Sequence, residues 1–381
     1  MIEKICDKEK CTGCFACANV CPIGAIRMKP GKIGHLYPDI SDKCIECGKC
    51  IKTCPANNPV ELKKPAKTLA FWVKDDREHQ SSTSGGAAAC FTNYVLEQEG
   101  VVYGCASLPQ GVIEHIRIDK KEHAYKLKGS KYVHSHINEC FKSIREDLSN
   151  EKIVLFVGLP CQVAGLRRYI GKNDTNLYCI DLICHGVPSQ KVLFEYIESL
   201  GIKRDEISVV AFREAKGYYL TIKSSGRSVY HKNESDDLYY MAFNDNLCFR
   251  DSCFTCRYSS PNRVGDLTIG DFWGLGKKVP FRYNTHGHVS VVLVDNEKGK
   301  WLMKECRDKY EAVHRSLDEA VAGNHNLKRP SVAPNASKFQ ARYGKVGIQK
   351  ALKSCLWKRR IKAPLLPIIQ WILSKIRYGK T

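Results

Sequence analysis

The sequence contains no apolar run long enough to cross a lipid bilayer. The longest nearly uncharged apolar stretch covers residues 363–374, whereas a membrane-spanning helix needs about 20 residues. The first residues, MIEKICDKEK, carry charges at positions where a secretory signal peptide carries its apolar segment. We therefore expect a cytoplasmic protein.

Two common nucleotide-binding signatures are also missing. No Gly-x-Gly-x2-Gly pattern follows a predicted strand, which disfavours a Rossmann site for NAD. Residues 270–278, GDFWGLGKK, differ from the Walker A pattern in their spacing and lack its final Ser or Thr. A nucleoside triphosphatase is therefore disfavoured as well.

Acidic residues are absent from residue 320 to the end of the sequence, where fourteen of the twenty excess positive charges lie. The basic run KRRIK at 358–362, beside Trp357 and before the apolar run at 365–376, is typical of an amphipathic helix on an anionic membrane surface. We therefore expect peripheral contact with the inner face of the cell membrane. A dimerisation helix and a docking surface for an acidic ferredoxin or flavodoxin are the alternatives. Nucleic acid is not an expected partner, because no recognised nucleic-acid-binding module accompanies the charge.

Cysteine, by contrast, is abundant, with twenty residues in a chain of 381. Many of these residues fall in tight, repeated spacings, which favours metal or cluster ligation over the disulfide framework of a small secreted domain. The segments CTGCFACANVCP at 11–22 and CIECGKCIKTCP at 44–55 form a short internal repeat. Both read Cys-x2-Cys-x2-Cys-x3-Cys-Pro, the spacing of bacterial two-cluster ferredoxins.

In that arrangement three thiolates of one loop bind one 4Fe-4S cluster, and the fourth cysteine crosses to the other cluster. Zinc also accepts four thiolates, but its ligands usually come as two separated pairs. Cys6 lies outside both motifs and is expected to be an ordinary thiol. The predicted ligand sets are Cys11, Cys14, Cys17 and Cys54 for one cluster and Cys44, Cys47, Cys50 and Cys21 for the other.

The pattern along the chain predicts an α+β fold with four parts, in which a small two-cluster ferredoxin-like domain is fused to a larger mixed α/β domain. The larger domain alternates apolar β-type runs with helix-like stretches. Its expected strands include 69–73, 100–108, 152–159, 177–184 and 289–295, with an antiparallel portion at 207–228. The four parts are the ferredoxin domain at 1–60, a Lys/Pro linker at 61–67, the larger domain at 68–335 and the basic tail at 336–381.

Four segments of the larger domain carry a resemblance to a known family. They are SSTSGGAAACF at 81–91, KLKGSKYVHS at 126–135, VGLPCQVAGLRR at 157–168 with IDLICHGVPS at 180–189, and RDSCFTCRYSSPNRVGDLTIGDFWG at 250–274. In this order and spacing they resemble the family of flavoprotein β-subunits of coenzyme F420 hydrogenases and dehydrogenases. The family shares an FAD site next to an iron-sulfur cluster, which implies an FAD-dependent iron-sulfur oxidoreductase. Relatives with this fused layout are often encoded among bacterial polysaccharide genes, which implies a substrate from a glycan pathway.

The resemblance implies FAD ligands in two loops. The first loop precedes a predicted helix, where backbone N–H groups and the helix dipole can meet a pyrophosphate, although an ordinary N-cap is the alternative. The second loop offers close approach, one cation and one ring, and its lysine taken alone would be a solvated surface charge. The predicted flavin-binding residues are Ser84, Gly85 and Gly86 in the first loop and Gly129, Ser130, Lys131 and Tyr132 in the second.

The resemblance also implies a third 4Fe-4S cluster, for which we predict the ligands Cys161, Cys184, Cys253 and Cys256. The first two follow predicted strands and the Cys-x2-Cys pair lies in a loop, so all four thiols can meet at one edge of a sheet. The first two residues are alternatively small core residues. Cys248 is a rival fourth ligand.

His185 and Lys131 are the candidate catalytic residues. His185 and His134 suit proton donation to a reduced flavin or a substrate, because histidine titrates near neutral pH. A lone histidine is nevertheless more often not catalytic. Asp271 and Trp273 fit equally well as turn and packing residues or as neighbours of the cofactors.

The sequence therefore predicts a redox enzyme in which electrons pass among 4Fe-4S clusters and FAD, with the flavin converting one-electron transfers into a two-electron or hydride step. A ferredoxin, F420 or another reductant is the expected redox partner, and a homo-oligomer is an open alternative to a monomer. Two other functions are considered: an electron-transfer subunit that serves a separate catalytic partner, and a cluster-bearing sensor or scaffold without flavin.

Overall fold

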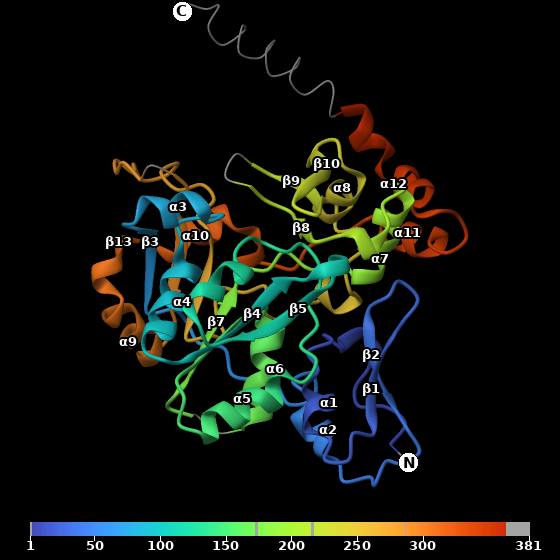
Figure 1. Ribbon diagram of the computed structural model, residues 1–381, viewed down its shortest axis with the longest axis horizontal. Coiled ribbons are helices and arrows are strands. Elements are labelled where there is room, and N and C mark those ends of the chain that lie inside the picture. The colour runs from blue at the N-terminus through green and yellow to red at the C-terminus, as the bar shows by residue number, and fades with distance from the viewer. Residues whose placement is uncertain (1, 172–173, 215–216, 286, 363–381) are drawn as a thin grey trace, which may run out of the picture.

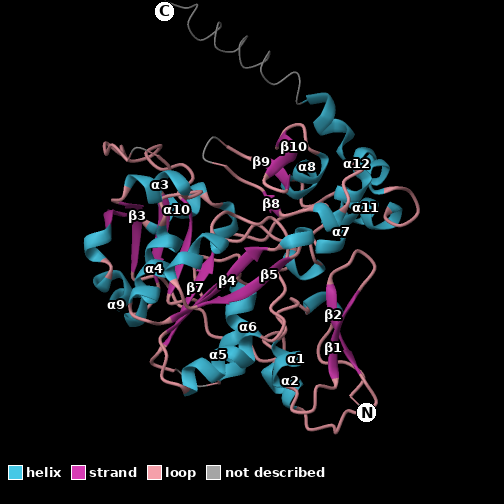
Figure 2. Cartoon of the chain, viewed as in Figure 1, coloured by secondary structure: helices cyan, strands magenta, loops and turns pink. Residues whose placement is uncertain are grey.

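The computed structural model describes residues 2–171, 174–214, 217–285 and 287–362. A small N-terminal unit lies beside a larger unit of mixed helices and sheets (Figure 1). Helices and strands are interleaved throughout the described ranges (Figure 2). The α+β fold class predicted from the sequence is therefore confirmed.

The N-terminal unit keeps the internal symmetry of its sequence repeat. Each half contains one short helix, and both helices begin after a residue in the left-handed region, Phe15 at φ +65° and Gly48 at φ +69°. These tight turns allow successive cysteines of each repeat to face one centre. The elements of this unit are the helices α1 (Ala16–Val20) and α2 (Lys49–Thr53) and the hairpin strands β1 (Ile26–Pro30) and β2 (Leu36–Ile40).

The larger unit is built on an eight-stranded mixed sheet with the order β13-β3-β12-β11-β7-β6-β4-β5. Strands β4, β6, β7 and β11 pair in parallel, and the other pairs are antiparallel. All five strands predicted from apolar runs are present. The strands are β3 (Lys67–Val73), β4 (Val101–Ser107), β5 (Ile113–Ile118), β6 (Val154–Gly158), β7 (Leu177–Leu182), β11 (Leu267–Asp271), β12 (Ser290–Val294) and β13 (Tyr310–Arg315).

Helices cover both faces of this sheet. Side chains alternate between the faces along each strand, so Val102 packs with α4 and α9 whereas Val101 and Tyr103 pack with α5 and α6. Burial on both faces explains why the strands read as nearly continuous apolar runs. The helices around the sheet are α3 (Asp76–Ser81), α4 (Ala87–Glu97), α5 (Cys140–Ser149), α6 (Pro160–Ile170), α9 (Glu297–Glu305) and α10 (Leu317–Gly323).

A second, smaller sheet and four helices form a separate layer, which we call the helical layer (Figure 1). The antiparallel portion predicted at 207–228 is confirmed as part of its sheet. Phe339 and Leu352 are fully buried in its core, so residues 336–356, which belong to the predicted basic tail, pack within this layer. Its elements are β8 (Val209–Ala211), β9 (Tyr219–Ser224), β10 (Arg227–Asn233), α7 (Gln190–Ser199), α8 (Leu238–Asn244), α11 (Ala336–Arg342) and α12 (Ile348–Lys362).

The predicted membrane-contacting segment lies mostly at 363–381, outside the described residues. Within the ranges that the structure describes, no helix has both the length and the apolar character needed to cross a bilayer.

A buried ion pair fixes the loop that follows Cys253 and Cys256 to the large sheet. Asp181 in β7 and Arg263 are both buried, and Asp181 Oδ1 accepts a hydrogen bond from Arg263 Nη2 at 2.6 Å. The other carboxylate oxygen accepts from the two backbone N–H groups that follow Arg263. Arg263 Nη1 donates to the Tyr258 carbonyl at 2.7 Å. The cysteine-bearing loop therefore depends on this pair for its position.

We expect Asp181→Ala to lower the free energy of unfolding by about 3–5 kcal/mol, because the substitution leaves a buried guanidinium without its counter-charge. Anaerobic urea unfolding followed by circular dichroism measures this loss. Asp39→Ala is the control, since it breaks an exposed pair with Lys29 at 2.7 Å and is expected to cost no more than about 1 kcal/mol. Equal small losses in the two variants would contradict the structural role of Asp181.

Candidate functional site

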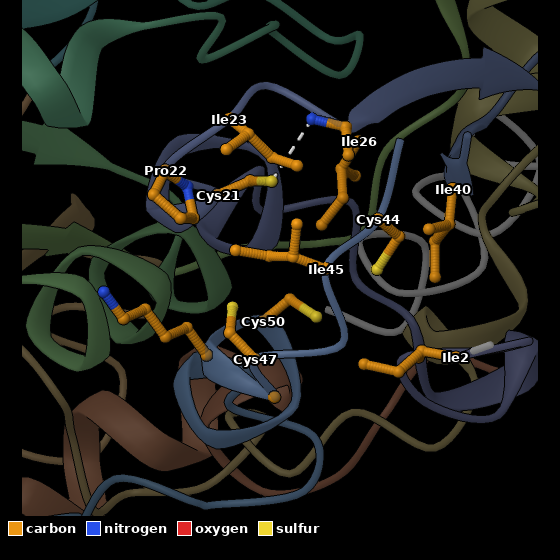
Figure 3. A pocket seen from close by; sticks show the side chains of 13 residues that line it. Ile2, Cys21, Pro22, Ile23, Ile26, Ile40, Cys44, Ile45, Cys47 and Cys50 are labelled. Atoms are coloured by element: carbon orange, nitrogen blue, oxygen red, sulfur yellow. Dashed lines mark hydrogen bonds between the residues drawn. The ribbon is translucent and has the colours of Figure 1, made fainter. Parts of the chain in front are cut away.

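The eight cysteines of the ferredoxin repeat line two hollows. Each of the two predicted ligand sets lines one of these hollows. The structure thus brings each set together, and the role of the thiols as ligands stays a prediction. Cys11, Cys14, Cys17 and Cys54 line the inner hollow, and Cys21, Cys44, Cys47 and Cys50 line the outer hollow (Figure 3).

The arrangement of these thiols suits a polynuclear cluster. Among the described residues, no three His, Cys, Asp or Glu side chains converge as the ligands of a single metal ion would. Each thiol set instead surrounds a hollow, which fits a cubane cluster better than one tetrahedral zinc ion.

The outer hollow reaches the protein surface. Its wall is apolar, and Ile45 within that wall is 61% exposed, next to the exposed Cys47. The Cys21 thiol accepts a hydrogen bond from the Ala25 backbone N–H at 3.2 Å, the kind of contact that tunes a cluster's potential. An electron carrier in solution can therefore approach this hollow. The isoleucines around it are Ile2, Ile23, Ile26, Ile40 and Ile45 (Figure 3).

The inner hollow is more deeply buried and is lined by a fifth thiol. Its four predicted ligands are each 8% exposed, and Cys6, which neither motif includes, also lines it. A hydrogen bond with Cys6 lowers the pKa of Cys54 to about 7. The same kind of contact lowers the pKa of Cys11 to about 6, with help from the Arg250 guanidinium. Cys6 therefore contacts two predicted ligands, which its position in the sequence does not reveal.

The four cysteines predicted to bind a third cluster come from separate elements and meet in space. Cys161 lies at the start of α6 after β6, Cys184 follows β7, and Cys253 and Cys256 lie in a loop after α8. Burial raises the pKa of the Cys161 and Cys184 thiols, and the charges of the neighbouring cysteines raise both further. Burial also raises the pKa of Cys253 to about 11. We call these four residues the third thiol set.

Cys248, the rival fourth ligand, is not brought to this set. It is 1% exposed in the core of the helical layer, where it neighbours Cys355. Its carbonyl accepts a hydrogen bond from His35 Nε2 at 3.1 Å.

Helix α6 connects the inner hollow with the third thiol set. Gly165 lies one helical turn after Cys161, and a Cβ atom at Gly165 would lie 2.9 Å from both Cβ and Sγ of Cys14. Cys14 and Tyr258 belong to one apolar core, against which Cys161 and Cys256 also pack. The absence of a side chain at Gly165 therefore allows the inner hollow and the third set to approach each other.

The remaining predicted site residues lie around the carboxyl edge of the parallel strands. Strands β6 and β7 end there just before Cys161 and Cys184, and β11 ends there with Asp271. In open α/β sheets, ligands bind in the crevice outside this edge. A ligand is therefore expected to contact the loops that follow these strands.

The two loops predicted to bind FAD lie side by side at this edge. The hydroxyl groups of Thr83 and Ser130 are 3.5 Å apart. Ser290 Oγ donates to Ser84 Oγ at 3.0 Å and accepts from the Gly85 backbone N–H at 2.9 Å. The first loop is thereby fixed to the start of β12.

The two positions of the first loop that are occupied by glycine require it for different structural reasons. A Cβ atom at Gly85 would lie 2.1 Å from the Phe71 carbonyl oxygen, so this glycine is needed for close packing on the sheet. Gly86 has φ +82° and begins α4, whose start has no side-chain cap among the described residues. The first backbone N–H groups of α4 are thus available to an anionic group.

Lys131 is not the solvated charge that its sequence alone would predict. Its ammonium group donates to the carbonyl oxygens of Cys105, Leu127 and Lys128 at 2.8–3.0 Å, and burial lowers its pKa. An ammonium group has three N–H donors, and all three are used here. Lys131 therefore holds the second loop against β4, with Gly129 at φ +83° in the turn.

Polar and aromatic side chains from the helical layer close the other side of this region. Tyr132 stacks on Phe243 with ring centroids 4.6 Å apart. Arg213 Nη1 donates to Asp271 Oδ2 at 2.6 Å, and Asp271 is paired with Ser290 across β11 and β12. Asp271 Oδ1 and the hydroxyl group of Tyr218 are buried without a hydrogen-bond partner in the described part of the chain. Such groups are the expected contacts of a bound ligand.

The two histidines singled out from the sequence lie in different places. His185 packs against Phe243 and Phe249, interacts with the Asn326 side chain at 3.3 Å and has a pKa lowered by burial. His134 is buried against the inner hollow instead, because its Cε1 lies 3.0 Å from where a Cβ atom of Gly13 would be. Of the two, His185 is the one next to the third thiol set.

Sequence reasoning missed several residues that the structure brings to these sites. Arg213 and Ser290 come to the carboxyl edge from distant segments, and Cys6 lies outside the cysteine repeat. Arg250 contacts the inner hollow although it lies in the segment of Cys253. Its place three residues before a predicted ligand is the one signal that could have found it.

Comparison with known families agrees with this division of the chain. Residues 10–58 match the 4Fe-4S dicluster domain. Residues 151–319 match the family defined by the C terminus of the beta subunit of coenzyme F420 hydrogenase/dehydrogenase. The second match contains all four members of the third thiol set.

Similar proteins share part of this chain. The coenzyme F420-dependent sulfite reductase of Methanocaldococcus jannaschii is 25% identical over 260 residues, which cover 58% of this chain and 39% of that protein. One subunit of the F(420)H(2) dehydrogenase of Methanosarcina mazei is 22% identical over 214 residues, which cover 52% of this chain and 61% of that protein. This chain thus spans less than two thirds of the length of either relative.

A solved chain of the F420-reducing [NiFe] hydrogenase complex from Methanosarcina barkeri is similar with a TM-score of 0.47 and 14% identity, covering 72% of this chain and 98% of that one. The family matches carry the conclusion: residues 10–58 are similar to the 4Fe-4S dicluster domain and residues 151–319 to the C terminus of the beta subunit of coenzyme F420 hydrogenase/dehydrogenase, so the family resemblance stated from the sequence is confirmed.

Proposed function

We propose that this protein is an FAD-dependent iron-sulfur oxidoreductase that couples one-electron carriers to a two-electron or hydride carrier such as F420. The observation that carries the proposal is the series of three thiol sets, which runs from the exposed outer hollow through the inner hollow to the carboxyl edge of the large sheet. Transfer of single electrons through a protein requires closely spaced redox centres, and the three thiol sets would bind three such clusters.

The residues at the carboxyl edge fit the chemistry of FAD. The first N–H groups of α4 suit a pyrophosphate, and the unpaired Asp271 Oδ1 and Tyr218 hydroxyl offer hydrogen bonds to a polar ring system. FAD, when bound, supplies the conversion between one-electron and two-electron transfers. Ser84 and Ser130 would meet its phosphates from the two loops, and Tyr132 would lie near its ring. Lys131 would keep the second loop in place and add a buried positive charge.

His185 is the residue that we assign to proton transfer. Burial lowers the pKa of its imidazole, and histidine is the side chain best suited to proton transfer near neutral pH. Its contacts with Phe243 and Asn326 fix the ring orientation. A reacting group at the carboxyl edge would therefore meet a proton-transfer group of fixed orientation.

The identity of the second substrate is part of the proposal. One named relative is an F420-dependent reductase and the other is a subunit of a dehydrogenase of reduced F420, which makes F420 the first two-electron carrier to try. A ferredoxin is the one-electron partner that suits the outer hollow, and the ultimate substrate would be a small molecule, with a glycan-pathway compound as our suggestion.

An electron-transfer subunit without its own substrate is the second candidate function. The observation in its favour is that one relative is itself a subunit of a dehydrogenase and that this chain spans less than two thirds of both named relatives. In that case the outer hollow or the carboxyl edge would face a catalytic partner.

Anaerobic turnover separates the two functions. We expect the purified chain alone to oxidise reduced F420 when a one-electron acceptor such as oxidised ferredoxin or a viologen is supplied, because the hydride step and the electron path lie in one chain. NADH is the control donor and is expected to be inactive, since no Rossmann signature is present. Turnover only after addition of a partner protein would contradict the enzyme proposal and favour the subunit.

Replacement of one thiol tests the third cluster. We expect the wild-type protein to hold about twelve irons per chain, and Cys184→Ser to hold about eight, because four irons belong to each cluster. Iron and acid-labile sulfide analysis of the anaerobic protein measures both. Cys248→Ser is the matched control and is expected to keep the full iron content, since Cys248 lies in the core of the helical layer. Equal iron in all three proteins would contradict the assignment of the third thiol set.

A charge at the start of α4 tests the FAD site. Ala88 is half-buried at the second position of this helix. We expect Ala88→Glu to weaken FAD binding at least tenfold, because its carboxylate would repel a pyrophosphate, while the helix dipole favours the same carboxylate and preserves the fold.

Ala88→Gln is the matched control, because it adds nearly the same volume without charge. Its loss of FAD affinity is expected to be clearly smaller. The effect is measured as the amount of FAD released per chain from proteins whose iron content is unchanged. Full FAD retention in the glutamate variant would show that the pyrophosphate does not lie at this helix.

A further inference from the structure

Arg250 is a buried cation at the junction of the N-terminal unit with the larger unit. The residue is 1% exposed. Its backbone belongs to the third-cluster segment, since its carbonyl accepts a hydrogen bond from the Cys253 N–H at 2.9 Å. Its side chain points the other way, into the N-terminal unit.

The contacts of the guanidinium group lie in the N-terminal unit. Nη1 donates to the Cys11 carbonyl at 3.1 Å, and Nη2 donates to the Leu36 carbonyl. The guanidinium carbon lies 4.4 Å from the centre of the Tyr37 ring. One side chain therefore joins the loop of Cys253 to the loop of Cys11.

The charge of Arg250 has no carboxylate partner, in contrast to other buried arginines. Arg263 pairs with Asp181 and Arg213 pairs with Asp271, both at 2.6 Å. Within the described ranges no acidic side chain forms an ion pair with Arg250, and its Nε is buried without a hydrogen-bond partner. A buried charge is stable only when an opposite charge or hydrogen bonds compensate it. The Asp251 carboxylate approaches the same Tyr37 ring, but it forms no ion pair with Arg250 in the described residues and its Oδ1 accepts a hydrogen bond from Gln340. The thiol set of the inner hollow is a second source of negative charge beside the guanidinium.

The cysteine loop is shaped for this approach. Gly13, between Cys11 and Cys14, has φ +66°, and a Cβ atom there would lie 2.5 Å from Nη2 of Arg250. Any larger residue would push the guanidinium away from the loop. His134, whose Nε2 is also buried without a partner in the described residues, approaches Gly13 from the same side.

We propose that Arg250 is the positioning residue of the inner cluster: it supplies the buried counter-charge of that cluster and thereby raises its reduction potential, while it holds the Cys11 loop against the Cys253 loop. The inference rests on the proposed function only in that a 4Fe-4S cluster occupies the inner hollow. It requires neither FAD nor F420.

The electron balance gives the direction of the effect. Reduction would add one electron to the inner cluster and would make or break no covalent bond, so the cluster with its thiolates would become more negative by one charge. The electron would come from a one-electron carrier at the outer hollow and would pass to a cluster held by the third thiol set, which would be reduced as the inner cluster is reoxidised. A buried positive charge beside Cys11 stabilises the reduced state, because net charge and hydrogen bonds set such potentials.

Redox titration of the anaerobic full-length protein, followed by electron paramagnetic resonance, tests the proposal. We expect Arg250→Gln to make reduction of one cluster at least tenfold less favourable, which is 59 mV for a one-electron couple. Arg250→Lys keeps the charge and is expected to stay within threefold of the wild type. The cluster concerned is identified as the signal that also changes in Cys14→Ser.

Arg168→Gln is the matched control. It removes the same charge and one hydrogen bond to the N-terminal unit, from Arg168 Nη2 to the Lys52 carbonyl at 2.8 Å. Arg168 is half-buried, and its Nε is buried without a partner in the described residues, but solvent reaches its contact with Lys52. Water and salt screen a charge that solvent reaches, so this variant is expected to change every cluster potential by less than threefold.

The outcomes separate clearly. Unchanged potentials in a fully loaded Arg250→Gln protein, or an Arg250→Lys protein shifted as much as the glutamine variant, would overturn the proposal. If the Arg250 variants do not bind all clusters, loss of the inner-cluster signal alone supports the proposal, provided that the Arg168→Gln control binds every cluster. Loss of every cluster signal would overturn it, because Arg250 would then serve general folding. A wild-type protein without flavin or F420 turnover would refute the proposed function and leave this test intact.

Discussion

Close packing of helix α6 on the Cys14 loop is the constraint on which the redox arrangement depends. Helix α6 starts with Pro160 shortly after β6, carries Cys161 at its second position and presents Gly165 to Cys14 one turn later. A single rigid helix thus fixes a residue of the third thiol set and the wall of the inner hollow at once. Any side chain at Gly165 would separate them, because interiors are close-packed and cannot yield to an added group without cost.

Buried polar contacts fix the loop of Cys253 in addition to this packing. Asp181 and Arg263 hold one end of the Cys253 loop to the large sheet, while Arg250 holds the other end to the N-terminal unit. The same loop is therefore fixed by two buried arginines with different partners, one paired with a carboxylate and one bonded to the Cys11 and Leu36 carbonyl oxygens. Stability and the proposed electron transfer would depend on the same contacts, so a substitution in this loop is expected to affect both.

The parts of the site that the sequence predicts well are those set by local spacing. The fixed intervals of the cysteine repeat indicate which thiols share a hollow, and apolar runs such as 152–159 indicate strands buried on both faces. Contacts between distant segments carry no such signal. Arg250 reaching Cys11, Ser290 holding Ser84, and Lys131 bonding to three carbonyl oxygens instead of standing free all depend on tertiary packing.

Iron anomalous diffraction from anaerobically grown crystals of the full-length protein tests the central claim most directly, because it locates clusters independently of any activity. The account predicts three anomalous peaks in series, at the outer hollow, at the inner hollow and among Cys161, Cys184, Cys253 and Cys256. Two peaks confined to the N-terminal unit, with none at the carboxyl edge of the large sheet, would contradict it.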